Sequence, residues 1–195
     1  MTGRPPRIVL GTGNAHKVVE LTAILGPLLP GVEFLRSEGP SPVEDGDTFE
    51  ANALIKARAA HGGTGLPAIA DDSGVVVEGL GGEPGIFSAR YAGTGSDEDN
   101  RALVLERLGA TTDRAARFVC AAVYVDDEVE IVRTAEWEGS ILDAARGELG
   151  FGYDPIFAPA DGGGRSVAEL TAEEKNLISH RGLAFRALVE ALPAP

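Results

Sequence analysis

Two adjacent aspartates, Asp71 and Asp72, are the residues of this sequence best suited to acid–base or metal chemistry. They follow the apolar run 66–70 and precede Ser73 and Gly74, so the pattern predicts a buried strand that ends in a sharp turn at the pair. Open α/β sheets usually bind ligands at such strand ends. Neighbouring carboxylates repel each other unless a divalent cation or a raised pKa relieves the repulsion. The alternative interpretation is a solvated Asx turn without a chemical role.

A glycine loop near the N-terminus is a candidate anion site. The sequence predicts a strand at 7–10, the loop GTGNAHK at 11–17 and an amphipathic helix that stops at Gly26-Pro27. This order directs backbone N–H groups and the positive end of a helix dipole toward an anion, and Lys17 adds a point charge. The loop is neither a Walker A loop nor a G-x-G-x-x-G fingerprint, so an ordinary tight turn with a solvated lysine is the alternative.

A second lysine, Lys56, lies on a helix predicted from Asp47 to about residue 60. Asp47 and Glu50 have the spacing of a capping box. Lys56 shares a helix face with Asn52, which lies four residues earlier, although a surface lysine is the alternative. Glu44, in the acidic loop before this helix, is able to reach a metal ion or to face water.

The segment 148–157, ELGFGYDPIF, combines glycines, three aromatic rings and an aspartate, and it is expected to end in a strand. Glycine beside an exposed ring suits the close approach of a flat ligand, so a purine could stack on Phe151 or Tyr153. Core aromatic residues are the alternative.

Cationic residues also occur in the two helices predicted near the C-terminus. Thr171 and Glu174 form a capping box for a short helix that carries Lys175. His180 and Arg181 lie in the first turn of the last helix, where a cation opposes the helix dipole. Such an unfavourable placement suggests a ligand.

The sequence predicts further elements between these segments. They are a strand at 32–35, a strand at 75–77, a glycine-rich loop at 79–95, a helix opened by Ser96 and Asp99 that stops at Gly109, and a hairpin of 117–125 with 129–137. The length of the loop is typical of a lid, a binding loop or an interface segment, whereas the hairpin is expected to be structural.

Composition limits the possible partners. The 195 residues suit one domain in two lobes, spanning 1–195, with flexible ends at 1–6 and 193–195. Seventeen basic and 30 acidic residues give a net charge of −13, which argues against DNA, RNA or an anionic membrane as partner. No apolar stretch reaches the length of a membrane span and no signal core precedes Arg7, so we expect a cytoplasmic protein. The single cysteine, Cys120, is expected to be a buried, inert thiol.

The sequence resembles the non-canonical purine nucleoside triphosphate pyrophosphatases, the family of the inosine/xanthosine triphosphate (dITP/XTP) pyrophosphatases. The resemblance rests on seven motifs in the same order: TGNAHK, EDGxTFxxNAxxKA, ADDSG, GxPGIFSARY, GFGYDPIF, AELTxEEKN and ISHRG. It covers nearly the whole chain, from Arg7 to Leu192.

The resemblance implies a fold, an activity and a set of site residues. The fold is an elongated mixed β-sheet with flanking helices, in two lobes around a nucleotide cleft, and the protein is a homodimer. The activity is Mg²⁺-dependent hydrolysis of ITP, dITP or XTP to the monophosphate and pyrophosphate. Substrate binding is assigned to Thr12, Gly13, Asn14, Ala15, His16, Lys17, Ser73, Phe151, Gly152, Tyr153, Asp154, Lys175, His180 and Arg181. Asp72 is the proton acceptor and a metal position, and Lys56 and Glu44 match cleft positions.

The chemistry of these residues agrees with that activity. Hydrolysis at the α-phosphorus needs charge neutralisation on three phosphates and a base for the attacking water. Lys17, Lys56 and Lys175 supply positive charge, and Asp72, Asp71 and Glu44 are the candidate Mg²⁺ ligands. We expect Asp72 to be the base, assisted by Lys17 and Lys56.

Base selection follows from hydrogen bonding. Donors from Arg181, His180 or the backbone would pair with the 6-keto oxygen of hypoxanthine or xanthine and would be left unpaired by the amino group of adenine. Two other functions stay open: a pyrophosphatase for pyrimidine or modified nucleotides, and a nucleotide sensor that binds without turnover.

Overall fold

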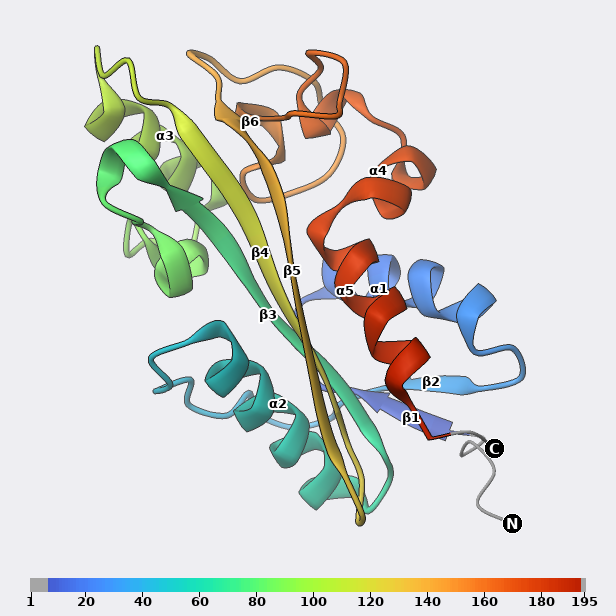
Figure 1. The fold of residues 1–195 in the computed structure, drawn as a ribbon. Coiled ribbons are helices and arrows are strands. Elements are labelled where there is room, and N and C mark those ends of the chain that lie inside the picture. Colours follow the sequence, from blue (N-terminus) through green and yellow to red (C-terminus); the bar gives the residue numbers. More distant parts are fainter. Residues whose placement is uncertain (1–6, 194–195) are drawn as a thin grey trace. The chain divides into compact units, whose positions relative to one another are not determined.

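The computed structural model describes residues 7–193 and shows a mixed α/β fold with one six-stranded sheet (Figure 1). The strand order is β2-β1-β3-β4-β5-β6, with β1 parallel to β2 and β3 and with β5 antiparallel to β6. The strands are β1 Arg7–Leu10, β2 Glu33–Arg36, β3 Ala68–Val77, β4 Ala115–Val125, β5 Glu130–Ile141 and β6 Phe157–Pro159. The predicted fold class, a mixed β-sheet with flanking helices, is confirmed.

Five α-helices accompany these strands in the described chain: α1 Ala15–Leu28, α2 Phe49–Thr64, α3 Asp97–Leu108, α4 Ala172–Ile178 and α5 His180–Ala191. Short 3₁₀ turns occur at Glu78–Leu80, Gly85–Arg90, Asp154–Ile156 and Val167–Glu169. None of the helices within 7–193 has the length and apolar character that crossing a membrane requires. The ends expected to be flexible, 1–6 and 193–195, lie outside the described residues except for Pro193.

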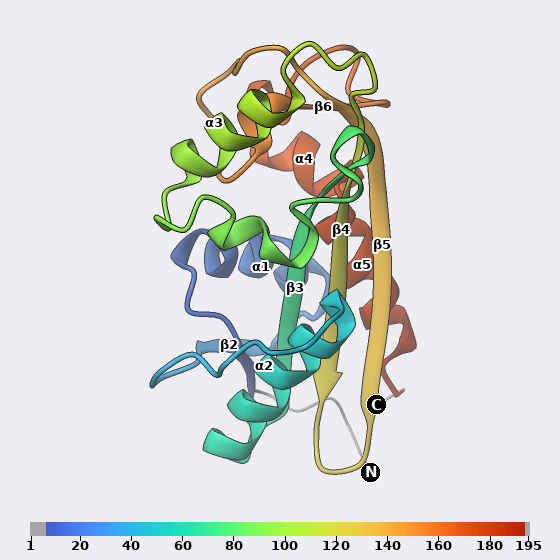
Figure 2. The same cartoon turned by 90° about the vertical axis from the view of Figure 1, so that its left-hand side faces the viewer.

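The chain divides into two compact units. The first takes in the chain up to Asp72, residues 120–135 and the chain from Arg181 onward, and the second takes in residues 73–119 and 136–180. In the first unit, α1 and α5 pack on one face of the strands around Leu21 and Phe185. Helix α2 packs on the opposite face through small residues such as Ala53 and Ala57, as Figures 1 and 2 show.

The second unit has its own apolar core. Val104 and Leu108 of α3 pack with Phe118 of β4 and with Phe157 of β6. Because the segment 148–157 runs directly into β6, this core fixes one end of the ring-bearing segment. The strand expected at the end of the segment 148–157 is confirmed as β6, where Phe157 is fully buried.

Strand β3 runs without a break from Ala68 to Val77. The predicted turn at Asp71 and Asp72 is therefore wrong, and so is the alternative of a solvated Asx turn, because the two residues are only 0% and 7% exposed. The strand can continue through the core because buried cations pair with both carboxylates. The pair lies in the middle of a strand rather than at its end.

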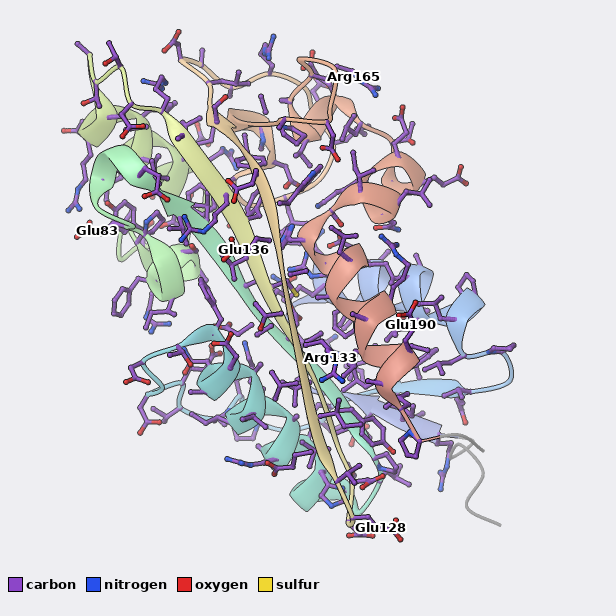
Figure 3. All side chains as sticks on the ribbon, viewed as in Figure 1. Glu83, Glu128, Arg133, Glu136, Arg165 and Glu190 are labelled. Carbon is purple, nitrogen blue, oxygen red and sulfur yellow. The ribbon has the colours of Figure 1, made fainter. Side chains whose placement is uncertain are left out.

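The predicted stop of α1 at Gly26-Pro27 is wrong, because the helix continues through Pro27 to Leu28. Other predicted helix ends agree with the structure. Ser96 caps α3 and Gly109 ends it, and the capping box of Thr171 with Glu174 is present. Helix α2 differs: its cap is Thr48, whose hydroxyl accepts from the N–H of Ala51 at 3.1 Å, and it continues past the predicted end to Thr64. The predicted hairpin is confirmed as β4 and β5, with Glu128 labelled at its tip in Figure 3.

Candidate active site

Lys56 of α2 and Asp72 of β3 form a buried ion pair. Nζ of Lys56 donates to Oδ1 of Asp72 at 2.6 Å and to Oε2 of Glu44 at 3.3 Å. Burial lowers the pKa of Lys56, but the nearby carboxylates, chiefly Asp72, outweigh this and hold it above the ordinary value. Burial also raises the pKa of Asp72 above its ordinary value, and Lys56 offsets only part of this effect. The site therefore keeps a charged lysine beside a carboxylate that is a stronger base than usual.

Asp71 lies one residue earlier in the strand and has a different environment. Its Oδ2 accepts from Lys17 Nζ at 2.9 Å and from two nitrogens of Arg181 at 3.2 and 3.3 Å. Burial would raise the pKa of Asp71, but Lys17 and Arg181 outweigh it and hold the pKa well below the usual range. Its Oδ1 is buried and has no hydrogen-bond partner among the described residues. Asp71 is thus permanently charged at neutral pH.

Arg181 connects three elements of the first unit. Besides Asp71, its guanidinium binds Glu20 of α1, with Nη1 at 2.8 Å from Oε2. Burial lowers the pKa of Arg181, but Glu20 and Asp71 outweigh it and raise the pKa further above its ordinary value. These contacts engage Nε, Nη1 and Nη2 of Arg181. The expected role of Arg181 as a hydrogen-bond donor to a purine base stays a prediction.

Cys120 is buried beside Asp71, with Sγ 3.9 Å from Oδ2. Burial and the charge of Asp71 raise the pKa of the thiol. The expected buried, inert thiol fits this environment, since the thiolate is the reactive form.

The glycine loop has the predicted strand–loop–helix arrangement. Asn14 caps α1, and its side chain accepts from the N–H groups of His16 at 2.9 Å and Lys17 at 3.3 Å. Gly11 lies so close to β3 and α2 that a Cβ there would be 3.1 Å from both Ala70 Cβ and the Lys56 carbonyl oxygen. The loop therefore starts in direct contact with the strand of the aspartates.

The second unit brings together a second group of predicted residues. Lys175 Nζ donates to Asp154 Oδ2 at 2.8 Å and lies 4.7 Å from the ring centroid of Phe151. The same Oδ2 accepts from the N–H of Phe151 at 2.9 Å. Gly150 has a φ of +77° and no space for a Cβ against Asp154. A half-buried ring is thus held against a lysine and a buried carboxylate.

Two further predicted residues lie in the core of this unit. Tyr153 is buried and donates from its hydroxyl to the carbonyl oxygen of Ser88 at 2.7 Å. His180 is buried and stacks on Phe118, with ring centroids 4.6 Å apart and an interplanar angle of 8°. Phe151, which is only half-buried, is therefore the ring better suited to stack on a ligand.

Several residues that contact the predicted site residues were missed from the sequence. Glu20 pairs with Arg181, Arg36 donates to the carbonyl oxygen of Gly13 at 3.0 Å, and Phe118 stacks on His180. All three act through contacts between residues far apart in the sequence, which no local spacing signals. Asn52, noted only for its place beside Lys56, accepts from the N–H of Gly46 at 2.9 Å.

The carboxylates of the first unit fit part of a Mg²⁺ ligand set. Glu44 and Asp72 both approach Nζ of Lys56, so both are directed at the same region. Mg²⁺ usually takes one or two carboxylates and completes its shell with phosphate oxygens and water. Within residues 7–193, no three His, Cys, Asp or Glu side chains form a ready-made metal group. The residues present therefore offer two carboxylates, the number that Mg²⁺ usually takes from a protein.

Comparison with known proteins defines the class. The model of the Ham1 family matches residues 8–191, so the chain belongs to the Ham1 family, and the resemblance described above is confirmed.

Individual relatives agree with this membership. The dITP/XTP pyrophosphatase of Leifsonia xyli subsp. xyli is 50% identical, with 96% of each chain covered, and that of Deinococcus radiodurans is 48% identical, covering 95% of this chain and 92% of the relative. Among solved structures, a HAM1 protein from Coxiella burnetii has a TM-score of 0.84 at 41% identity, covering 94% of this chain and 96% of that one. A nucleoside-triphosphatase / dITP/XTP pyrophosphatase from Mycobacterium abscessus has a TM-score of 0.73 at 44% identity, with 96% and 98% covered.

Proposed function

We propose that this protein hydrolyses the non-canonical purine nucleoside triphosphates XTP, ITP and dITP to the monophosphate and pyrophosphate, and so removes them from the nucleotide pool. The names of the relatives support the substrate class. The observation that carries the proposal is the buried pair of Lys56 and Asp72, which places a charged lysine beside a carboxylate of raised pKa.

Asp72 is the general base of the proposed reaction. Its carboxylate takes a proton from water, the water oxygen forms a bond to the α-phosphorus, and the bond from that phosphorus to the α,β-bridging oxygen breaks to release pyrophosphate. The raised pKa makes Asp72 a better proton acceptor than an ordinary carboxylate. Asp72 is 7% exposed, so its side chain is not completely shut off from solvent.

The phosphates bind residues of the first unit. Lys17, Lys56 and the loop from Thr12 to His16 neutralise or hydrogen-bond the phosphate oxygens, with the N-terminus of α1 adding its dipole. Ser73 contacts the substrate beside Asp72. Lys17 is held by Asp71, so its ammonium group is oriented before the substrate arrives.

The proposed cofactor is Mg²⁺, held by Glu44 and Asp72 with Asp71 in support. When bound, it supplies positive charge that neutralises the phosphate oxygens. The position of both carboxylates near Lys56 supports this assignment.

The purine base is assigned to Phe151 and to the other predicted base-binding residues. The purine stacks on Phe151, while Gly152, Tyr153, Asp154, Lys175, His180 and Arg181 position the ring or donate to its 6-keto oxygen. Adenine is disfavoured because its amino group leaves those donors unpaired.

The proposed context is a cytoplasmic homodimer with no nucleic acid polymer or membrane as partner. The net charge of −13 supports the exclusion of polyanions. Light scattering of the purified protein tests the dimer, since a mass near 20.2 kDa would contradict it.

A panel of triphosphates tests the proposed function. XTP, ITP, dITP, GTP, ATP, CTP and UTP are incubated with and without Mg²⁺, and pyrophosphate is measured. We expect turnover of the first three with Mg²⁺. Hydrolysis of ITP in ¹⁸O-labelled water should place the label in the monophosphate, because water attacks the α-phosphorus. Preference for a pyrimidine nucleotide, binding without product, or label in pyrophosphate would contradict the proposal.

A further inference from the structure

Gly152 is held by helix α3 through both of its main-chain polar groups. Nη1 of Arg101 donates to its carbonyl oxygen at 2.6 Å, and its N–H donates to Oδ2 of Asp97 at 2.8 Å. Asp97 and Arg101 are four residues apart, so they project from the same face of the helix. Both hydrogen bonds involve a charged side chain, which makes them stronger than bonds between neutral groups.

The two bonds fix the orientation of two successive peptide units. The N–H of Gly152 belongs to the peptide unit that follows Phe151, and its carbonyl belongs to the unit that precedes Tyr153. Gly152 has a φ of +60°, a conformation that a residue with a Cβ rarely adopts. The helix therefore holds in place a turn of the chain whose geometry decides where the ring of Phe151 points.

The residues next to Gly152 in this turn are held by contacts already described. Asp154 accepts from the N–H of Phe151, Lys175 binds Asp154, and the hydroxyl of Tyr153 reaches Ser88. The contacts from Asp154 and Tyr153 do not hold Gly152 itself. Only Asp97 and Arg101 among the described hydrogen-bond partners do so.

We propose that Asp97 and Arg101 are positioning residues that set base discrimination by holding Gly152, and with it the ring of Phe151, in the geometry that accepts a 6-keto purine. This inference rests on the proposed function. Neither residue is placed at the phosphates, so their loss should weaken binding of the base more than the chemical step.

Substitutions on α3 test the proposal with matched controls. Arg101→Ala and Asp97→Ala remove one bond each, whereas Asp97→Asn keeps an oxygen that can accept from Gly152. Arg107→Ala and Glu98→Ala remove a charge of the same sign from the same helix without touching Gly152, since Arg107 binds Glu83 and Tyr91 instead. Thermal unfolding identifies variants that fold.

The readouts are kcat and KM for ITP and ATP, with amide hydrogen exchange of residues 148–154. We expect KM for ITP to rise about tenfold in Arg101→Ala with kcat changed less than about threefold, a lower ITP/ATP ratio of kcat/KM, and faster exchange of this segment. Asp97→Ala should show the same changes to a smaller degree. Asp97→Asn should have an ITP/ATP ratio of kcat/KM close to that of the unsubstituted protein.

The outcomes separate the two claims. A folded Arg101→Ala protein with unchanged ITP/ATP selectivity overturns the inference and leaves the proposed function intact. So does an equal loss in Arg107→Ala, because the effect would then belong to the helix as a whole. Failure of the unsubstituted protein to hydrolyse ITP overturns the proposed function, and this inference with it.

Discussion

Lys56 Nζ lies 2.6 Å from Oδ1 of Asp72, and both side chains are almost completely removed from solvent. A carboxylate in such a position keeps its charge only while a cation faces it, because burial favours the neutral form. The lysine thus has two effects. It holds the carboxylate in place, and it keeps the base ionised at neutral pH.

Replacing Lys56 with Met should shift the pH dependence of turnover. Asp72 acts as a base only when ionised, so activity is lost as the pH falls through its pKa. Without Lys56 that pKa rises further, and the acidic limb of kcat/KM for ITP moves to higher pH. Arg58→Met is the control, because Arg58 is on the same helix but pairs with Glu130 at the surface. An acidic limb that stays in place would refute this role of Lys56.

Asp71→Asn should destabilise the protein in a pH-dependent way. The folded-state pKa of Asp71 lies below its ordinary value, so its charge stabilises the fold above about pH 4 and less as the pH falls further. Loss of the charge leaves Lys17 and Arg181 without their shared carboxylate, at a cost of about 3–5 kcal/mol near neutral pH. Urea unfolding at pH 7 and pH 3 measures the free energy of unfolding of the variant and of the unsubstituted protein. The difference between the two proteins should be smaller at pH 3 than at pH 7. The exposed hairpin residue Glu128, replaced by Gln, is the control (Figure 3). A difference that is equal at both pH values would contradict the account.

Asn52→Ala should impair the loop that carries Glu44. The buried side chain of Asn52 accepts from the N–H of Gly46, and Gly46 itself has no space for a Cβ. Removing the amide of Asn52 leaves the N–H of Gly46 without an acceptor, and we expect the free energy of unfolding to fall by about 1–3 kcal/mol. It should also raise the Mg²⁺ concentration needed for half-maximal turnover, because Glu44 is no longer held. Glu50→Gln on the same helix should leave that concentration unchanged, and an unchanged Mg²⁺ requirement in folded Asn52→Ala would count against the metal assignment of Glu44.

Phe118→Leu should weaken substrate binding through His180. The ring of Phe118 stacks on His180, and its loss removes an aromatic contact of about 0.5–1.5 kcal/mol. We expect a lower thermal midpoint and a higher KM for ITP with kcat nearly constant. Phe87→Leu is the control, since Phe87 is 53% exposed and its ring contacts the guanidinium of Arg90 rather than His180. Lower stability with an unchanged KM would limit Phe118 to a structural role.

Local signals made the helix ends and the hairpin predictable. Ser96 with Asp99 and Thr171 with Glu174 are capping pairs whose partners lie three residues apart, so the sequence contains the whole interaction. The order of the motifs supplied the candidate site residues, and the structure brings some of them into contact, such as Lys56 with Asp72 and Lys175 with Asp154.

The environment of the aspartates was not predictable in this way. Asp71 and Asp72 looked like a turn because carboxylates are rarely buried without a partner. The partners of Asp71, Lys17 and Arg181, lie 54 and 110 residues away from it, and Lys56, the partner of Asp72, lies 16 residues away. Only the folded chain brings these groups together. The same applies to Arg101, which reaches Gly152 across 51 residues.

Turnover of ITP by Asp72→Asn, measured as pyrophosphate release with Mg²⁺ present, shows whether Asp72 is the general base. Asparagine has nearly the same shape but is not a useful proton acceptor. We expect kcat to fall by about 10²- to 10⁴-fold while the protein stays folded. A fall of less than about tenfold would contradict the assignment of Asp72 as the base.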